Sequence, residues 1–281
     1  MTTTAILFPG QGSQTPGMRD DVERVRPDLL ALASECVGED PFSLVQEGTR
    51  FAQPAIFCAS LAGWAALGRP EADLMAGHSL GELAALVAAG ILSERSALEL
   101  VVLRGRLMQE AGERAGDGGM LALLGAGAAE QAEEIAGAHG LAIANDNSPQ
   151  QVVLSGSRDA FDAASDAACE LGLRPMVLPV TGAFHSPMMA SAVPEFEAAL
   201  ATVELAPDPV PGVTVLSAVT AQPFDDVRRR LAEALTSPVR WREVVLAMHD
   251  RGARRFVEVG PGKVLTGLVK RTVRDVELVS V

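Results

Sequence analysis

The chain has 281 residues, of which 48% are apolar, and its formal net charge is −13 at pH 7. This length fits one large α/β domain, or a large domain with a small insertion, and the apolar share is enough for a sizeable core. The negative charge argues against non-specific nucleic-acid binding, and no apolar run is long enough to span a bilayer. We therefore expect neither nucleic acid nor a membrane as a partner.

The cysteines and the N-terminus indicate a compartment. Three widely spaced cysteines disfavour a disulfide framework or a metal site and fit a reducing environment. Residues 1–4 lack the basic start of a signal peptide. The expected location is the cytoplasm.

Apolar runs and turn residues predict an α/β chain of two units. Residues 119–185 hold two βαβ-like halves, the pattern of a small ferredoxin-like insertion. Residues 1–118 and 186–281 are expected to form the large domain, with a mainly parallel sheet. Strands are expected at 5–8, 74–76, 120–124, 141–144, 151–155, 175–180, 213–218 and 255–259, with a turn at 145–149. Helices are expected at 82–89, 94–110, 129–138 and 161–171. Residues 27–67 are also expected to be mostly helical, with interruptions near 38 and at 53–54.

The sequence GHSLG at residues 77–81 lies between two apolar runs. It predicts a strand, a sharp turn with Ser79 at its apex, and a helix whose first N–H groups face the turn. This is the pattern of a nucleophile elbow. Glycine and serine also form ordinary turns between strands and helices, so the stretch alone leaves both interpretations open.

A serine nucleophile needs a base, and the chain has four histidines. His78 adjoins Ser79, so its side chain is expected to leave the turn in another direction. His139 and His249 fall at predicted helix ends, where a cationic side chain is ordinary. His185 lies between a strand and a helix that begins with proline, and elimination leaves it as the candidate base. The inference depends on Ser79, since a lone loop histidine is usually a surface residue.

Arg104 falls on the apolar face of the helix predicted at 94–110. An arginine on a buried face needs an anionic partner, and its planar guanidinium suits a carboxylate. The alternative is a structural ion pair with one of the 36 acidic residues. Arg106 is expected to face solvent. The apolar stripe around Arg104 consists of Ala97, Leu100, Val101, Leu107 and Met108.

Several short motifs together resemble the malonyl-CoA:acyl carrier protein transacylases. Each motif is weak alone, but they follow one another in the expected order from about residue 5 to residue 271. They are FPGQGSQ (8–14), QPA (53–55), GHSLGE (77–82), RG and MQ (104–105 and 108–109), NSPQQVV (147–153), AFHS (183–186), SPVRW (237–241) and VGPGKVLTGL (259–268).

The resemblance implies a hydrolase-like α/β fold and a ping-pong acyl transfer on a serine–histidine pair. Ser79 would attack the thioester of malonyl-CoA, and His185 would take up the proton and return it to the leaving thiol. Backbone N–H groups of Leu80 and Gln11 would hold the oxyanion. Arg104 would bind the free carboxylate of the malonyl group.

The resemblance also implies supporting roles. A main-chain carbonyl would orient the histidine, and the spacing to Trp241 assigns it to Ala234, where many relatives carry glutamine. Gln53 would line the site without reacting. Phe184, just before the histidine, would crowd an α-methyl branch and favour malonyl over methylmalonyl by about 1–3 kcal/mol.

The substrates and partners follow from the same resemblance. Malonyl-CoA would be the donor, and the acceptor would be the phosphopantetheine thiol of an acyl carrier protein, free or within a polyketide synthase. No bound cofactor or metal is expected, and the protein is expected to be a monomer. Fatty acid and polyketide pathways both fit, and the strictness for malonyl stays open.

Two other functions remain possible from the sequence. A hydrolase with the same Ser/His pair could remove acyl chains from carrier proteins, with water as the second nucleophile. Arg104 distinguishes this hydrolase from the transferase, because an editing enzyme for varied acyl chains has no use for a residue that binds a carboxylate. The other alternative is a docking module without catalytic activity. The presence of Ser79, His185 and Arg104 argues against it. Residues 228–274 hold twelve basic and four acidic residues. Part of this basic stretch is a candidate docking surface for the carrier protein, with Arg254 and Arg255 as the residues to test.

Overall fold

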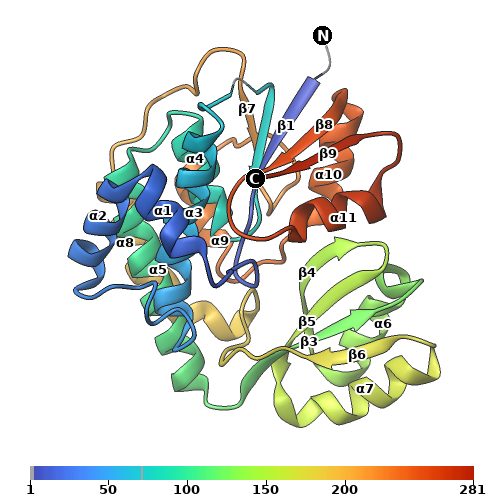
Figure 1. The fold of residues 1–281 in the computed structure, drawn as a ribbon. Coiled ribbons are helices and arrows are strands. Elements are labelled where there is room, and N and C mark those ends of the chain that lie inside the picture. The colour runs from blue at the N-terminus through green and yellow to red at the C-terminus, as the bar shows by residue number, and fades with distance from the viewer. Residues whose placement is uncertain (1–2, 71) are drawn as a thin grey trace.

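The structure is a computed structural model that describes residues 3–70 and 72–281. Its larger sheet consists of β1 (Thr3–Phe8), β2 (Leu74–Gly77), β7 (Thr214–Leu216), β8 (Ala253–Glu258) and β9 (Glu277–Ser280). The strand order is β7-β2-β1-β8-β9 (Figure 1), and every neighbouring pair is parallel. Parallel strands need crossover connections, so helices cover both faces of such a sheet.

The residues of β1 show how the two faces are built. Ile6 and Phe8 pack in one apolar cluster, whereas Ala5 and Leu7 pack in another, as the alternation of side chains along a strand requires. The first cluster includes residues of α1 (Met18–Val25), α2 (Pro27–Val37), α3 (Thr49–Ala66), α4 (Gly81–Ala88), α5 (Glu94–Ala115), α8 (Val193–Thr202) and α9 (Val227–Glu233). The second includes residues of α10 (Trp241–Asp250) and α11 (Val264–Thr272).

The smaller sheet lies beside the C-terminal ends of the larger one (Figure 1). Its chain order is β3 (Gly118–Leu124), α6 (Ala128–His139), β4 (Ala142–Ser148), β5 (Gln151–Ser157), α7 (Phe161–Glu170) and β6 (Arg174–Val177). The strands pair antiparallel in the order β4-β5-β3-β6. This β-α-β-β-α-β arrangement is ferredoxin-like. The predicted fold class, a hydrolase-like α/β domain with a small ferredoxin-like insertion, is therefore confirmed.

Several predictions about single elements are wrong. The helix α3 runs through Pro54 without a break, because nearly all of its residues are buried and packing outweighs the loss of one helical hydrogen bond. The strand β4 extends to Ser148, where a turn was expected. The strand predicted to reach residue 180 ends at Val177, and β9 was not expected at all.

Two contacts tie the smaller sheet to the larger unit near the site. β4 forms a parallel bridge between Asn145 and Val239, just before α10. The next residue, Asp146, forms an ion pair of 2.8 Å with Arg242 of α10. Within residues 3–70 and 72–281, no helix combines the length and hydrophobicity needed to cross a membrane.

Candidate active site

The turn between β2 and α4 requires glycine on both sides of Ser79. A Cβ added to Gly77 would lie 1.8 Å from the carbonyl carbon of Gly81, and one added to Gly81 would lie 2.2 Å from the carbonyl oxygen of Phe8. Ser79 itself has φ of +54°, a conformation that is strained for a residue with a side chain. The stretch therefore forms the strand, sharp turn and helix of a nucleophile elbow.

His185 lies next to the elbow. Its Nε2 is 2.9 Å from Ser79 Oγ, and its Nδ1 is 2.7 Å from the carbonyl oxygen of Ala234. A carbonyl can only accept, so Nδ1 carries the proton and Nε2 is free to accept one from the serine. Burial, followed by the charge of Arg104, lowers the pKa of His185 to about 3, which keeps the imidazole neutral at pH 7.

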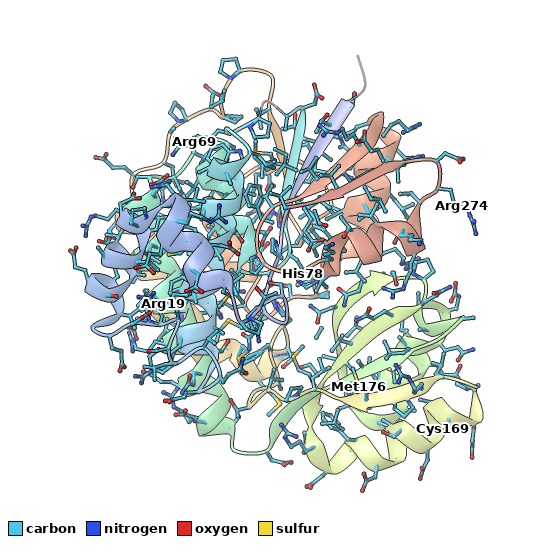
Figure 2. All side chains as sticks on the ribbon, viewed as in Figure 1. Arg19, Arg69, His78, Cys169, Met176 and Arg274 are labelled. Atoms are coloured by element: carbon cyan, nitrogen blue, oxygen red, sulfur yellow. The ribbon has the colours of Figure 1, made fainter. Side chains whose placement is uncertain are left out.

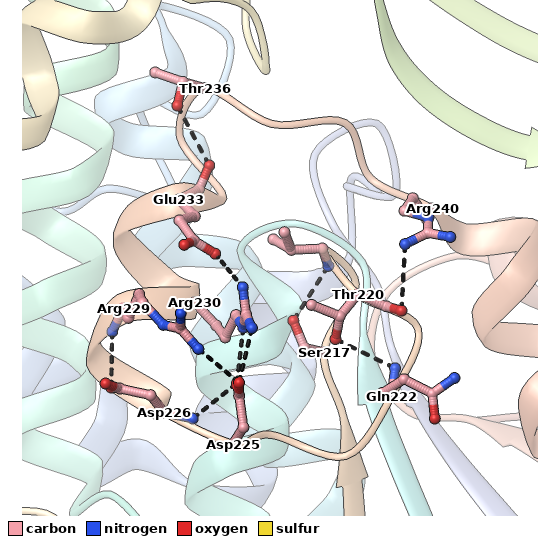
Figure 3. Close-up of polar contacts among 11 residues, drawn as sticks. Ser217, Thr220, Gln222, Asp225, Asp226, Arg229, Arg230, Glu233, Thr236 and Arg240 are labelled. Carbon is pink, nitrogen blue, oxygen red and sulfur yellow. Dashed lines mark hydrogen bonds and ion pairs between the residues drawn. The ribbon is translucent and has the colours of Figure 1, made fainter.

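The carbonyl of Ala234 is held in place by α9, shown in Figure 3. The Asp226 side chain caps the helix by accepting from the Arg229 N–H at 3.0 Å. Arg230 pairs with Asp225 at 2.7 Å and with Glu233 at 2.6 Å. Ala234 follows directly, at the end of the helix, so these contacts fix the acceptor that orients His185.

Arg104 reaches the same serine from α5, and only 3% of its surface is exposed. Its guanidinium donates to Gln53 Oε1 at 2.8 Å and to Ser79 Oγ at 3.0 Å. Within the described parts of the chain no carboxylate forms an ion pair with it, so the structural ion pair considered from the sequence is not found. Burial lowers the pKa of Arg104 to about 10, with Glu82 opposing the shift, so the guanidinium remains charged at pH 7.

Two backbone N–H groups beside Ser79 are open to a ligand. Leu80 and Gln11 both line the site, and in residues 3–70 and 72–281 neither N–H has a hydrogen-bond acceptor. The side chain of Gln11 accepts a hydrogen bond from Thr49, and Gln53 donates to the same threonine at 3.4 Å. These contacts link the loop of Gln11 to the residue that holds Arg104.

These groups surround a cavity of about 210 Å³. Its apolar wall is formed by Met108, Met120, Leu178, Val180 and Phe184. A larger cavity of about 360 Å³ lies between α1, α3 and the loop before α11, and it contains none of the candidate site residues. Ala234 is the one predicted site residue that does not line the smaller cavity. Its carbonyl contacts Nδ1 of His185, the ring nitrogen that does not face Ser79.

Sequence reasoning missed the contacts of His78 and Glu82. As expected, His78 points away from Ser79, and its Nε2 lies 2.8 Å from Oδ1 of Asn147 in β4. Figure 2 shows His78 where the ribbons of the two sheets approach each other. Glu82 is buried in α4 and accepts from the Ala218 N–H at 2.7 Å, and burial raises its pKa to about 7. The sequence signal that could have identified Glu82 is the presence of a glutamate within an Ala/Leu-rich helix.

Arg254 and Arg255 of the basic C-terminal stretch do not border the cavity. Arg254 and Arg255 lie at the start of β8, whereas Ser79 follows the C-terminal end of the parallel strand β2. The two arginines are therefore at the opposite edge of the sheet. Arg254 donates to main-chain carbonyls, and Arg255 pairs with Glu277. These two arginines therefore do not lie at the rim of the site, and a docking role for the rest of the stretch stays a prediction.

The chain is similar to known proteins over nearly its full length. The acyl transferase domain family matches residues 32–281. The malonyl CoA-acyl carrier protein transacylase of Escherichia coli K12 is 39% identical, over 97% of this chain and 94% of that protein. The polyketide biosynthesis protein ThaF of Burkholderia thailandensis is 40% identical over 95% of this chain, which spans 24% of that longer protein.

Solved structures give the same result. In the structure of a type II polyketide synthase acyl carrier protein in complex with its malonyl-transacylase, the matched chain has a TM-score of 0.88 and 35% identity. The match covers 100% of this chain and 96% of that one. The family predicted from the motifs is confirmed: the chain belongs to the acyl transferase domain family and, within it, to the malonyl CoA-acyl carrier protein transacylases.

Proposed function

We propose that the protein transfers a malonyl group from malonyl-CoA to the phosphopantetheine thiol of an acyl carrier protein, through a malonyl ester on Ser79. One observation carries the proposal. The Ser79 hydroxyl lies 2.9 Å from a neutral imidazole and 3.0 Å from a charged guanidinium that has no carboxylate partner in the described chain. A base and an unpaired cation on one hydroxyl suit a nucleophile whose acyl substrate carries a negative charge.

In the first half-reaction, Ser79 Oγ attacks the thioester carbonyl carbon, and His185 Nε2 accepts the hydroxyl proton. The carbonyl oxygen becomes an oxyanion, which accepts hydrogen bonds from the backbone N–H groups of Leu80 and Gln11. Collapse of this intermediate breaks the carbon–sulfur bond. The CoA sulfur leaves with the proton from His185, and the malonyl group remains on Ser79 as an ester.

The second half-reaction repeats these steps in reverse order. The carrier-protein thiol gives its proton to His185 and attacks the ester carbonyl. The ester bond to Ser79 breaks, and His185 returns the proton to the serine oxygen. The Ala234 carbonyl stabilises the imidazolium that exists between the steps, because it accepts from Nδ1 throughout.

Arg104 and Gln53 select the acyl group. The guanidinium binds the free malonyl carboxylate, and Gln53 holds its Nη1 at 2.8 Å so that the other N–H groups face the cavity. Phe184 is buried and lines the same cavity, which supports the expectation that its ring crowds a branched acyl group. Malonyl is thus expected to be preferred over methylmalonyl.

The acceptor follows from the relatives. The E. coli relative is named for transfer to an acyl carrier protein, and one solved relative is in complex with such a protein. An acyl hydrolase is not favoured, because such relatives are transacylases and because Arg104 has a use only for an acyl group with a carboxylate. The expected cytoplasmic site of action, from the cysteine usage, belongs to the same proposal.

Labelled malonyl-CoA tests the proposal directly. The pure protein is incubated with it, alone and with phosphopantetheine-loaded carrier proteins of the fatty acid and type II polyketide kinds. We expect label on the protein alone and label on at least one carrier when it is present. Release of free malonate at the same rate with and without carriers would instead indicate a hydrolase.

A further inference from the structure

Thr49 is a buried residue that lies between the two ends of the active site. It is the first residue of α3, and 3% of its surface is exposed. Its hydroxyl donates to Oε1 of Gln11, on the loop after β1, and accepts from Nε2 of Gln53 at 3.4 Å. Thr49 does not line the active-site cavity, and the proposed chemistry gives its hydroxyl no role.

The hydrogen bonds around Thr49 all run in one direction. A guanidinium can only donate, so the Gln53 atom that faces Arg104 at 2.8 Å is its oxygen. The NH₂ group of Gln53 is thereby turned toward Thr49, which accepts from it and donates its own hydrogen to Gln11. Hydrogen bonds arranged in such a series strengthen one another. The series begins at the group that binds the carboxylate and ends at the residue proposed to bind the oxyanion.

The contact with Thr49 is the one hydrogen bond that holds Gln11. Gln11 is exposed and lies in a turn. Among residues 3–70 and 72–281, no group other than the Thr49 hydroxyl forms a hydrogen bond with its main chain or its side chain. The neighbouring residues are held separately, because the Ser13 hydroxyl donates to the Gly10 carbonyl at 2.7 Å and the Gly12 N–H donates to Gln14 Oε1 at 2.8 Å.

An oxyanion hole requires a fixed donor. A backbone N–H stabilises the developing negative charge well only when it already points at the position that the oxygen will occupy. A residue in an exposed turn reaches that precision when its side chain is locked by a supporting hydrogen bond. For Gln11 that support comes from Thr49, which is itself fixed because it begins a long buried helix.

We propose that Thr49 is a positioning residue for the oxyanion hole, since its hydroxyl fixes the Gln11 side chain and thereby holds the Gln11 N–H in place. Every thioester forms an oxyanion, so Thr49 acts on all acyl groups alike. Arg104, in contrast, acts only on an acyl group with a carboxylate. The inference rests on the proposed function, and it adds a residue that the substrate does not touch.

Four variants test the inference. Thr49→Val replaces the hydroxyl with a methyl group, and Thr49→Ser retains the hydroxyl. Gln11→Ala removes the carboxamide but keeps the backbone N–H. Thr202→Val is the matched control, because this exposed threonine of α8 donates to the Ala199 carbonyl and does not line the cavity. Acylation by malonyl-CoA and by acetyl-CoA is timed by quenching and intact-mass measurement, which gives the rate at saturation and KM for each.

Removal of one oxyanion donor lowers the rate by about 10²- to 10³-fold, and a displaced donor should cost part of this. We expect Thr49→Val to lower the saturating acylation rate by about 10- to 100-fold with both acyl-CoAs, while KM stays within about threefold. Gln11→Ala should show the same loss, and combining it with Thr49→Val should add no more than about twofold. Thr49→Ser and Thr202→Val should stay within about threefold of the wild type.

Three results would overturn the inference. A loss confined to malonyl-CoA would show that Thr49 supports Gln53 and Arg104 instead. Unchanged rates in Gln11→Ala would show that its side chain does not position the donor, and this variant alters an exposed residue, so it decides the question even if Thr49→Val does not fold. Losses that multiply in the double variant would show that the two residues act independently. Failure of the wild type to form a malonyl ester would instead refute the proposed function.

Discussion

Replacing Arg104 with alanine separates carboxylate binding from general damage to the site. The guanidinium is 3% exposed, and in the described chain it binds only neutral groups, Gln53 Oε1 and Ser79 Oγ. Its charge is therefore available for the malonyl carboxylate. A hydrogen bond to a charged group contributes about 1.5–3 kcal/mol, so a bidentate contact contributes about 3–6 kcal/mol.

These values give the expected size of the effect. We expect Arg104→Ala to lower kcat/KM for malonyl-CoA by about 10²- to 10⁴-fold, since each 1.4 kcal/mol is a factor of ten. Acetyl-CoA has no carboxylate, so acetyl transfer should stay within about threefold of the wild type or rise. Both rates are measured by transfer of labelled acyl groups to the same carrier protein.

Arg106→Ala is the matched control. Arg106 lies two positions further along α5, faces solvent and pairs with Glu110 and Glu195. Such exposed pairs contribute about 0–1 kcal/mol to stability, so the control should leave both transfers nearly unchanged. If Arg104→Ala lowers malonyl and acetyl transfer to the same extent, Arg104 supports the fold of the site and does not select the substrate.

Three further predictions concern Phe184, His185 and Glu82. Phe184→Ser should raise kcat/KM for methylmalonyl-CoA relative to malonyl-CoA by about 10- to 200-fold in a competition assay, and an unchanged ratio would remove Phe184 from selection. The pKa of His185 is lowered to about 3, and the neutral form accepts the proton. Activity should therefore persist as the pH falls through 6.5 and decline only well below it; a drop centred near 6.5 in the kcat/KM profile for acylation would contradict this. The raised pKa of Glu82, about 7, stabilises the fold at low pH, and this contribution is lost as pH rises through 7. In the wild type, ionisation of Glu82 should lower the free energy of unfolding by about 3 kcal/mol between pH 5 and pH 8, measured by urea titration, and Glu82→Gln should not show this decrease. An identical pH dependence in both proteins would show that Glu82 ionises normally.

The parts of the site that local patterns determine were predictable from the sequence. The elbow is a continuous strand, turn and helix, and its glycines are adjacent to the serine that they expose. Arg104 was identified by helical spacing alone, because its position on an apolar face is a property of one helix. Ser79 and His185 are 106 positions apart, and they were paired by elimination among four histidines.

The contacts that depend on tertiary packing were not predictable in this way. The Ala234 carbonyl was assigned through the family resemblance, since a main-chain acceptor leaves no residue pattern. Residues 145–149 have the composition of a turn, yet β4 continues through Ser148, because β5 and Val239 supply its hydrogen-bond partners. For that reason the sequence did not reveal Asn145 and Asn147 as residues of the site.

The central claim is that Ser79 carries the malonyl group between the two substrates. The most direct measurement is the intact mass of the protein after brief exposure to malonyl-CoA without a carrier protein, followed by mapping of the modified peptide. We predict one malonyl adduct on the wild type, located at Ser79, and none on a folded Ser79→Ala variant. An adduct that persists in Ser79→Ala, or that maps to another residue such as Cys58, would contradict the mechanism.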